Sequence, residues 1–408
     1  LFSEFASKVE GIDYAMKHLK EWMKPEKRKT NKPMNFLGGK SQVRHFPKGV
    51  VGIISPWNLP FGLTVAPLTG ALAAGNRAIL KPSEFVPETA ALFAEIIPKY
   101  FSEDEVAVVT GGADISQRFA ELPFDHLLFT GSSNIGAKVM QSASKNLVPV
   151  TLELGGKSPV IISRSAKLDL AGTRLTFGKL LNGGQLCLSP DYVVVPDELE
   201  EQLIARVVHE AQSMYPNIIE NEDYAGVINE RHFARLQNYI DDAVAKGAKL
   251  TIVGADKTRA SEDNRRMPLH ILQNVNEDML VMHEEIFGPI LPVMTYSDVA
   301  EVPSMIEPRR NPLAMYYFGK DKREQEYLLS HVQSGGVCIN DITLHYVQED
   351  LPFGGIGASG MGAYHGPEGF RGMSHARAIY SQTMIDVLPI IGARPPFGEK
   401  FRKNISKI

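Results

Sequence analysis

The stretch HLLFTGSSNIG, residues 126–136, changes from the pattern of a strand to the pattern of a helix within a few residues. The apolar run predicts a strand, and the glycines and serines after it suit a turn into a helix from about Asn134. The first N–H groups of such a helix attract a phosphate. However, no glycine separates Gly131 from Gly136, so the full dinucleotide fingerprint is absent and an ordinary helix cap remains an equal alternative.

The segments around this stretch repeat the alternation of strand and helix. A helix is expected over Gly11–Met23, strands at 49–57, 76–83 and 106–112, and a further helix from near Pro87. Strands that alternate with helices predict a parallel sheet, which binds its ligand at the carboxyl ends of the strands.

A second α/β unit is expected in the later part of the chain. Its helices are predicted at Leu199–Tyr215 and at about 231–246, and the charged segment Asp256–Met267 is predicted to be an exposed loop. Its strands are predicted at 191–196, 248–254, 270–275, 289–296, 314–320 and 335–340.

Composition places the chain among ordinary globular proteins. It has 408 residues, of which 44% are hydrophobic and 22% charged, enough for two or three domains. The net charge of −4 gives no reason to expect nucleic acid as a partner. The two cysteines, Cys187 and Cys338, favour a reducing compartment, and no apolar run is long enough to cross a bilayer. A cytoplasmic protein is therefore expected.

The segment FGKLLNGGQLCLSP, residues 177–190, has the character of a reactive site. Gly183 and Gly184 allow the backbone to approach a ligand, and Cys187 follows them closely. Upstream, Glu153 stands in an apolar run, where burial would raise its pKa and make it a general base for a thiolate nucleophile. The alternatives are a buried structural cysteine and a strand-end carboxylate that caps a helix.

Two further segments carry expectations about packing. The glycine-rich run 351–370 predicts a backbone wrapped closely around other chain or substrate. The tail 379–387 regains strand character outside either core, so it and the polar segment 30–48 are expected to contact another subunit.

Seven short motifs, in order along nearly the whole chain, resemble the signature set of the aldehyde dehydrogenase superfamily. They are PWNLP at 56–60, KPSE at 81–84, FTGSSNIG at 129–136, LELGGK at 152–157, GQLC at 184–187, EEIFGP at 284–289 and PFGG at 352–355. CLSPDY and GMGAYHG resemble the class 3 branch and, within it, coniferyl aldehyde dehydrogenases more closely. Relatives of this kind begin earlier, so the chain is expected to be shortened at its N-terminus.

The resemblance implies a fold and its division. The fold is α/β, with a Rossmann-like parallel-sheet NAD(P)-binding domain at 1–29 and 48–155 and an α/β catalytic domain at 156–374. A small β oligomerisation arm and tail would comprise 30–47 and 375–408. A homodimer is implied, with a tetramer as the alternative.

The resemblance also implies site residues. Cys187 would be the nucleophile, Glu153 the base, and Asn58 with the Cys187 N–H the oxyanion hole. Residues implied to bind the cofactor are Trp57, Lys81, Glu84, Gly131, Ser132, Gly136, Glu285 and Phe287. NAD is favoured because Glu84 would repel a 2′-phosphate, NADP is the alternative, and no metal is implied. Without the resemblance, Lys81 and Glu84 are equally well a surface ion pair.

Three positions depart from the pattern of other branches. Ser189 stands where many relatives have an alanine two residues after the cysteine. A lysine and a glutamate that form a proton relay elsewhere correspond to Pro67 and Tyr364. The path by which protons leave Glu153 is therefore not given by the resemblance.

The implied function is NAD(P)-dependent oxidation of an aldehyde to its acid through a thiohemiacetal and a thioester on Cys187. Aromatic substrates such as coniferyl aldehyde, or medium to long aliphatic aldehydes, are favoured. One alternative is a CoA-acylating semialdehyde dehydrogenase, against which Glu153 counts. The other is a catalytically silent structural or binding relative.

Overall fold

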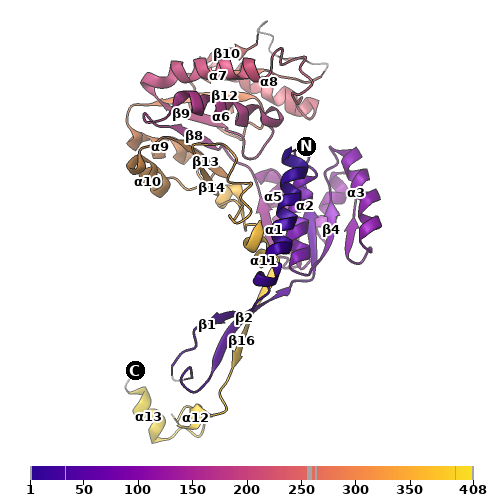
Figure 1. The fold of residues 1–408 in the computed structure, drawn as a ribbon, viewed down its shortest axis with the longest axis vertical. Coiled ribbons are helices and arrows are strands. Elements are labelled where there is room, and N and C mark those ends of the chain that lie inside the picture. The colour runs from indigo at the N-terminus through magenta and orange to yellow at the C-terminus, as the bar shows by residue number, and fades with distance from the viewer. Residues whose placement is uncertain (1, 33, 255–259, 262–263, 391, 407–408) are drawn as a thin grey trace.

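Three sheets organise the residues described by the structure, which is a computed structural model covering 2–32, 34–254, 260–261, 264–390 and 392–406. Two sheets form separate lobes covered by helices, and the third extends from them as an arm (Figure 1). The predicted α/β class, with parallel sheets and a small β arm, is confirmed. No helix among these residues is long and apolar enough to cross a membrane.

The first sheet has the strand order β15-β7-β6-β3-β4-β5. Five strands run parallel, and β15 pairs antiparallel with β7. Along the chain, β4 and β5 are added on one side of β3, and β6 and β7 are then added on its other side. The strand order therefore reverses between β3 and β6. The strands are β3 (Val50–Ile54), β4 (Arg77–Lys81), β5 (Val106–Val108), β6 (His126–Thr130), β7 (Val150–Glu153) and β15 (Gly360–Met361). The helices are α1 (Ser7–Trp22), α2 (Gly62–Ala73), α3 (Pro87–Tyr100), α4 (Ala113–Ala120) and α5 (Ser133–Ser144).

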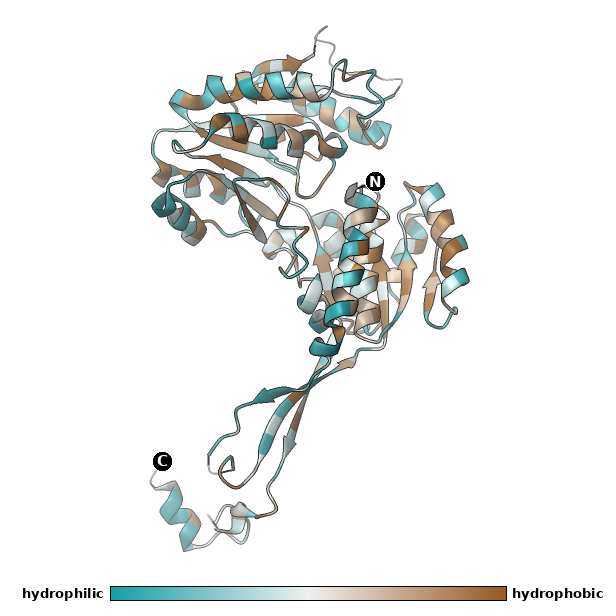
Figure 2. Ribbon diagram, in the orientation of Figure 1, coloured by the Kyte–Doolittle hydropathy of each residue, from teal (hydrophilic) through white to brown (hydrophobic). Residues whose placement is uncertain are grey.

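The second sheet has the order β10-β11-β12-β9-β8-β13-β14, with only β10 antiparallel to its neighbour. Its central strands are buried along their whole length, as expected of a parallel sheet covered on both faces, and Figure 2 shows hydrophobic residues within this sheet. The strands are β8 (Pro159–Ile162), β9 (Tyr192–Pro196), β10 (Lys249–Val253), β11 (Leu269–Gln273), β12 (Ile290–Tyr296), β13 (Ala314–Phe318) and β14 (Gly336–Ile339). The helices are α6 (Leu168–Leu180), α7 (Glu200–Met214), α8 (Glu230–Ala245), α9 (Val302–Ile306) and α10 (Lys322–His331).

The arm consists of β1 (Glu26–Arg28), β2 (Lys40–Pro47) and β16 (Ser374–Ser381), followed by α12 (Val387–Ile390) and α13 (Glu399–Ile405). The expected tail strand at 379–387 is wrong in its bounds. Pairing with β2 fixes β16 from Ser374, opposite Pro47, to Ser381, opposite Lys40. The arm also begins before residue 30, because β1 pairs with β2.

The C-terminal part of the expected catalytic domain lies with the first sheet. β15 pairs with β7, and α11 (Gly366–Gly372) packs against α1 and α2. A Cβ at Gly360 would lie 2.0 Å from the Leu152 carbonyl oxygen, so only glycine permits this approach. The expectation that the glycine-rich run wraps closely around other chain is confirmed here.

The predicted exposed loop at 256–267 falls partly outside the described residues, which omit 255–259 and 262–263. Its last residue, Met267, is buried rather than exposed. The Tyr224 hydroxyl donates to the Met267 carbonyl at 3.0 Å, so the end of this segment is fixed in the core below α8.

The two large sheets present opposite edges to each other. β7 passes through residues 154–158 directly into β8, so the carboxyl edge of the first sheet leads to the amino edge of the second. Because β8, β9 and β12 are parallel, the residues just before β9 and β12 lie at that same amino edge. Cys187 and Glu285 occupy these positions, and Glu153 ends β7.

Candidate active site

The loop that carries Cys187 has an unusual backbone path. After α6 the chain passes through Asn182, Gly183 and Gly184 with φ of 52°, 62° and 76°. A Cβ at Gly184 would lie 2.5 Å from the Gly288 carbonyl oxygen, which places the loop directly against the segment before β12. The paired glycines therefore serve the close approach expected from the sequence.

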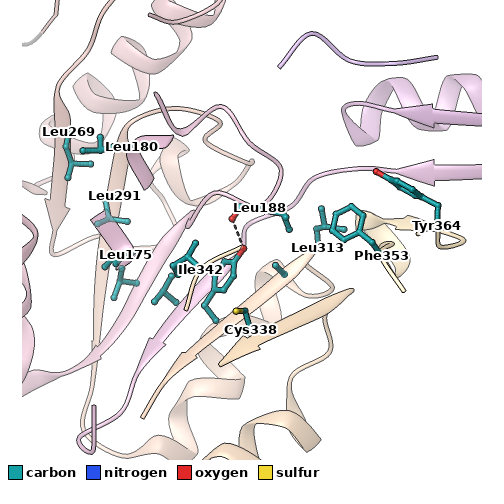
Figure 3. Close-up of a cluster of buried hydrophobic side chains, with 14 of the residues drawn as sticks. Leu175, Leu180, Leu188, Leu269, Leu291, Leu313, Cys338, Ile342, Phe353 and Tyr364 are labelled. Carbon is teal, nitrogen blue, oxygen red and sulfur yellow. Dashed lines mark hydrogen bonds between the residues drawn. The ribbon is translucent and has the colours of Figure 1, made fainter. Parts of the chain in front are cut away.

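Side chains hold this loop from both ends. Gln185 donates to the Gly226 carbonyl at 3.1 Å and accepts from the Ile228 N–H at 2.9 Å. On the other side of the cysteine, the Tyr316 hydroxyl donates to the Leu188 carbonyl at 2.6 Å (Figure 3). Cys187 is thus fixed between two anchored neighbours.

Asn58 lies beside the same loop. It follows β3, and its Nδ2 donates to the Gln185 carbonyl at 3.0 Å, while Asn182 Nδ2 donates to the Asn58 carbonyl at 3.0 Å. These reciprocal bonds bring the Asn58 amide to the backbone two residues before Cys187. The resemblance implies that Asn58 and Cys187 share one site, although more than a hundred positions separate them in the sequence.

Glu153 is 1% exposed at the end of β7. Its Oε1 has no hydrogen-bond partner among the described residues. Burial raises the pKa of this carboxyl well above its usual value. A buried carboxylate oxygen without a protein partner is available to a water or a substrate, which suits a base more than a structural cap.

The Cys187 thiol is partly buried and lies within electrostatic reach of two carboxylates. Burial is the largest cause that raises its pKa, followed by the negative charges of Glu153 and Glu285. The N–H groups of Cys187 and Leu188 act in the opposite direction by donating toward the sulfur. The fold has therefore gathered three reactive side chains from distant parts of the chain.

Glu285 is held in place by a buried ion pair that sequence reasoning missed. The Lys157 ammonium binds the Asp191 carboxylate and donates to the Val281 and Glu284 carbonyls, at 2.8 and 3.0 Å. Asp191 in turn accepts from the Ile286 N–H at 2.8 Å. Lys157 belongs to the LELGGK motif. A lysine directly after an apolar strand is the sequence feature that could have indicated this ion pair.

The surroundings of Glu285 also perturb its ionisation. Burial and the nearby Asp191 raise its pKa to about 8, against the opposing effect of the Gly156 N–H and Lys157. A Cβ at Gly155 would lie 1.9 Å from Glu285 Oε2, so the carboxylate occupies the space beside the backbone.

Aromatic side chains lie next to this carboxylate. The rings of Phe287 and Trp57 meet edge-on, with centroids 5.4 Å apart and an angle of 76°. Phe287 has a φ of 50°, which turns its side chain out of the regular path into β12. Together with Glu285 they form one wall between the two sheets.

The crevice for a dinucleotide is expected where the strand order reverses, between β3 and β6. Trp57 and Asn58 follow β3 there, and Gly131 and Ser132 follow β6. Ser132 precedes the first turn of α5 and makes no side-chain cap, so the first N–H groups of this helix are left for an anion. A Cβ at Gly131 would lie 2.5 Å from the Phe129 ring, so glycine is required in this turn.

The KPSE segment ends β4 at the same edge. Lys81 is buried and donates to the Pro82 carbonyl at 2.8 Å, so it is not a surface ion pair. Burial lowers its pKa, and the charges of Glu84 and Asp114 oppose that shift. An ammonium and an exposed carboxylate at this edge suit ribose hydroxyls, and with the α5 N-terminus they fit a dinucleotide.

Gly136 lies in the first turn of α5. Its N–H donates to the Ser132 carbonyl at 2.9 Å within α5, and a Cβ there would lie 2.7 Å from Leu154 Cδ2. Its backbone is therefore used by the helix, and its lack of a side chain lets α5 pack on the segment after β7. That Gly136 also touches the cofactor stays a prediction.

Comparison with known proteins identifies the relatives of this chain. The model of the aldehyde dehydrogenase family matches residues 2–379. A probable coniferyl aldehyde dehydrogenase of Caulobacter vibrioides is 47% identical over 406 residues, covering 99% of this chain and 84% of the relative. Aldehyde dehydrogenase family 3 member A2 of Mus musculus is 41% identical and covers 90% of this chain and 74% of the relative.

Solved structures give the same result. The substrate-bound state of AldH of Staphylococcus aureus has a TM-score of 0.91 and 37% identity, covering 99% of this chain and 86% of the other. An aldehyde dehydrogenase of Mycobacterium tuberculosis complexed with NAD+ has a TM-score of 0.84 and 27% identity, covering 94% of this chain and 78% of the other.

Proposed function

Since the chain belongs to the aldehyde dehydrogenase family, we propose that it oxidises aldehydes to carboxylic acids with NAD through a thioester on Cys187. The observation that carries this proposal is the convergence of the Cys187 sulfur with the Glu153 carboxylate, next to the Asn58 amide. Similarity to a probable coniferyl aldehyde dehydrogenase supports an aromatic aldehyde of that type as substrate. Medium to long aliphatic aldehydes are the second substrate class.

In the first stage, the Cys187 sulfur bonds to the aldehyde carbon. The thiol must first lose its proton to solvent, because only the thiolate attacks. Its pKa, kept high by burial and two carboxylates, would fall beside the positive charge of a bound oxidised nicotinamide. The oxygen that becomes negative receives hydrogen bonds from Asn58 Nδ2 and the Cys187 N–H. Loss of one such donor usually lowers turnover on the order of a hundredfold to a thousandfold.

Glu285, Phe287 and Trp57 are the residues that would hold a nicotinamide and its ribose beside Cys187. When bound, the oxidised nicotinamide supplies the hydride acceptor. Lys81 and Glu84 would bind the other ribose. The exposed Glu84 carboxylate repels a 2′-phosphate, so NAD is preferred over NADP.

In the second stage, Glu153 accepts a proton from the water that attacks the thioester. The unpartnered Oε1 and a pKa raised by burial suit this role, because a more basic carboxylate removes a proton more readily. A free acid is therefore the product, and added CoA should not change the rate.

The test compares three variants with NAD and coniferyl aldehyde. Cys187→Ala should lose NADH formation by roughly a thousandfold or more, as expected when a nucleophile is removed. Glu153→Gln should release a single burst of NADH and then stop at the thioester. Cys338→Ser, which alters the other cysteine, should keep full turnover. Steady-state activity in Cys187→Ala would exclude the mechanism.

A further inference from the structure

A cavity between α1, α2 and α11 contains polar side chains that the mechanism above does not use. Lys8, Pro67, Glu349, Tyr364 and His365 are among the residues that line it. The cavity brings together an ammonium and a carboxylate, those of Lys8 and Glu349, from distant parts of the chain.

Lys8 is 4% exposed, although it carries an ammonium group. Its Nζ donates to the Tyr346 hydroxyl at 2.9 Å and lies 4.4 Å from the centre of the same ring. The carboxylates of Glu349 and Glu4 are the charges that stabilise the ammonium there. Lys8 thus bonds to Tyr346 and lies within electrostatic reach of the half-buried Glu349.

Tyr346 and Tyr364 connect this lysine to the reactive site. After burial, the charges that raise the pKa of both phenols include Glu153 and Cys187, so both hydroxyls lie within electrostatic reach of the base and the nucleophile. Tyr364 is fixed by two backbone bonds with Phe353, of 2.8 and 2.9 Å, and by the β15–β7 pairing that puts Gly360 opposite Glu153.

Figure 3 shows how this region adjoins the nucleophile loop. Tyr364 lies beside Phe353 and Leu313 in the apolar cluster that also contains Leu188, the neighbour of Cys187. The rings of Tyr346 and Tyr364 each pack against Phe353, with centroids 4.7 and 5.6 Å away. The phenols therefore share one packed wall between Glu153 and the cavity.

Several buried polar atoms in this wall have no hydrogen-bond partner among the described residues. They are Glu153 Oε1, the Tyr364 hydroxyl and both ring nitrogens of His345 and of His365. Buried polar atoms are nearly always paired with protein or with ordered water. Their concentration in one region indicates a hydrated polar path through an otherwise apolar wall.

We infer that Tyr364, Tyr346 and Lys8 carry the proton of the deacylation step from Glu153 to the cavity at α1. This inference rests on the proposed function. The water oxygen bonds to the thioester carbon, one water proton goes to Glu153, and the carbon–sulfur bond breaks to return a thiolate on Cys187. The second water proton leaves with the acid, so the proton on Glu153 is the one that must be passed outward.

Each hydroxyl accepts a proton on its oxygen and releases its own to the next group, directly or through water. Lys8 first releases a proton toward Glu349 and solvent. The neutral amine then accepts the next proton from Tyr346. The acylation step described above uses none of the three side chains, so their loss should spare acylation. It should slow only the return of Glu153 to its charged form.

The test separates the two stages with stopped-flow measurement of NADH. In Tyr346→Phe, Tyr364→Phe and Lys8→Met, the first turnover should keep the wild-type rate, and steady-state turnover should fall roughly tenfold to a hundredfold. A burst of NADH near one per active site should then precede the slow phase. Imidazole in the buffer should restore part of the lost turnover in the variants and leave wild type unchanged.

Lys8→Arg distinguishes proton transfer from a structural charge. Arginine keeps the positive charge and the donor but cannot be deprotonated in a protein. It should therefore be as slow in deacylation as Lys8→Met. The matched control is Lys48→Met, which removes another partly buried lysine, bonded to His126 and the Gly372 carbonyl, and should not alter the ratio of burst to steady state.

Two results would overturn the inference. One is wild-type deacylation in Lys8→Arg or in Tyr346→Phe, and the other is an equal loss of burst and steady-state rates in all the variants. Neither result affects the proposed function, which depends on NADH formation by wild type and on the burst of Glu153→Gln.

Discussion

The Cys187 thiol lies within electrostatic reach of two carboxylates, and their charges affect when it can react. Without a bound cofactor, burial together with the charges of Glu153 and Glu285 holds its pKa above the usual value of 9.0. The thiol is thus kept protonated, which protects it from oxidation and alkylation. A positive charge brought next to the sulfur would reverse this effect.

The alkylation of Cys187 by iodoacetamide in the free enzyme should therefore be slow at neutral pH and still rising above pH 9. In Glu285→Gln the profile should move to lower pH, because Glu285, with a pKa of about 8, is charged in the range where the thiol titrates. Both profiles are measured in proteins that also carry Cys338→Ser, so that Cys187 is the one thiol that can be alkylated. An unshifted profile would show that Glu285 does not act on the sulfur.

Glu84 is a single exposed side chain that is expected to decide between two cofactors. Glu84→Gln removes the carboxylate that would repel a 2′-phosphate, so kcat/KM with NADP should rise roughly tenfold, with a smaller change for NAD. Steady-state rates with both cofactors check this. Glu88→Gln, on the first turn of α3, is the control for removing a nearby acid.

Among the elements, the segment before β12 depends on the buried pair of Lys157 and Asp191. Both side chains are 3% exposed, and both also bond to the backbone of that segment. An ion pair of this kind positions the segment more than it stabilises the fold, because desolvation offsets most of the attraction.

Lys157→Met should lower the free energy of unfolding by about 3–5 kcal/mol, since Asp191 is left buried and unpaired. The double variant with Asp191→Leu should recover much of that stability but not NAD affinity, because Glu285 and Phe287 are no longer held. Denaturant unfolding and NAD titration measure the two effects. Lys99→Met, which breaks an exposed pair with Glu95, should stay within about 0.5 kcal/mol of wild type.

The short strand β15 depends on glycine at one position. Gly360 has a φ of 136°, and a Cβ there would lie 2.0 Å from the Leu152 carbonyl oxygen. Gly360→Ala should destabilise the protein by at least about 2 kcal/mol, because strain and the clash both oppose the β15–β7 pairing. In Gly70→Ala the nearest atom would be 3.6 Å away, so this helical control should be neutral or stabilising in a thermal melt.

At the scale of the whole molecule, the arm is the feature whose stability a single chain does not explain. None of the described residues of β1, β2 or β16 belongs to a hydrophobic core, and a small sheet without a core is unstable by itself. Exposed apolar side chains occur along it, including Tyr380 at 50% and Met384 fully exposed. A second copy of the chain is the partner that we expect to cover them.

The protein should therefore sediment as a dimer. Tyr380→Asp with Met384→Asp should weaken the dimer at least about tenfold, since each buried apolar side chain contributes roughly 1.5–3 kcal/mol. Sedimentation across a dilution series measures this. Leu147→Asp, at a site 90% exposed on the first lobe, should leave the dimer intact. A monomer for wild type would contradict the expected role of the arm.

The sequence by itself determined the α/β class, most of the central strands, and the proposal of Cys187, Glu153 and Asn58 as partners. These properties are encoded locally, in apolar runs bounded by turns, in glycine pairs and in motifs of four to eight residues. The positive φ of Gly183 and Gly184 agrees with such a local prediction.

Only the tertiary structure decided the rest. It placed β15 and α11 with the first sheet, assigned β1 to the arm and moved the tail strand to 374–381. It also joined Lys157 to Asp191 and brought Lys8 to Tyr346, 338 positions along the chain. No local pattern predicts these contacts, because strand register and the burial of a charged group depend on partners that only the complete fold brings within hydrogen-bonding distance.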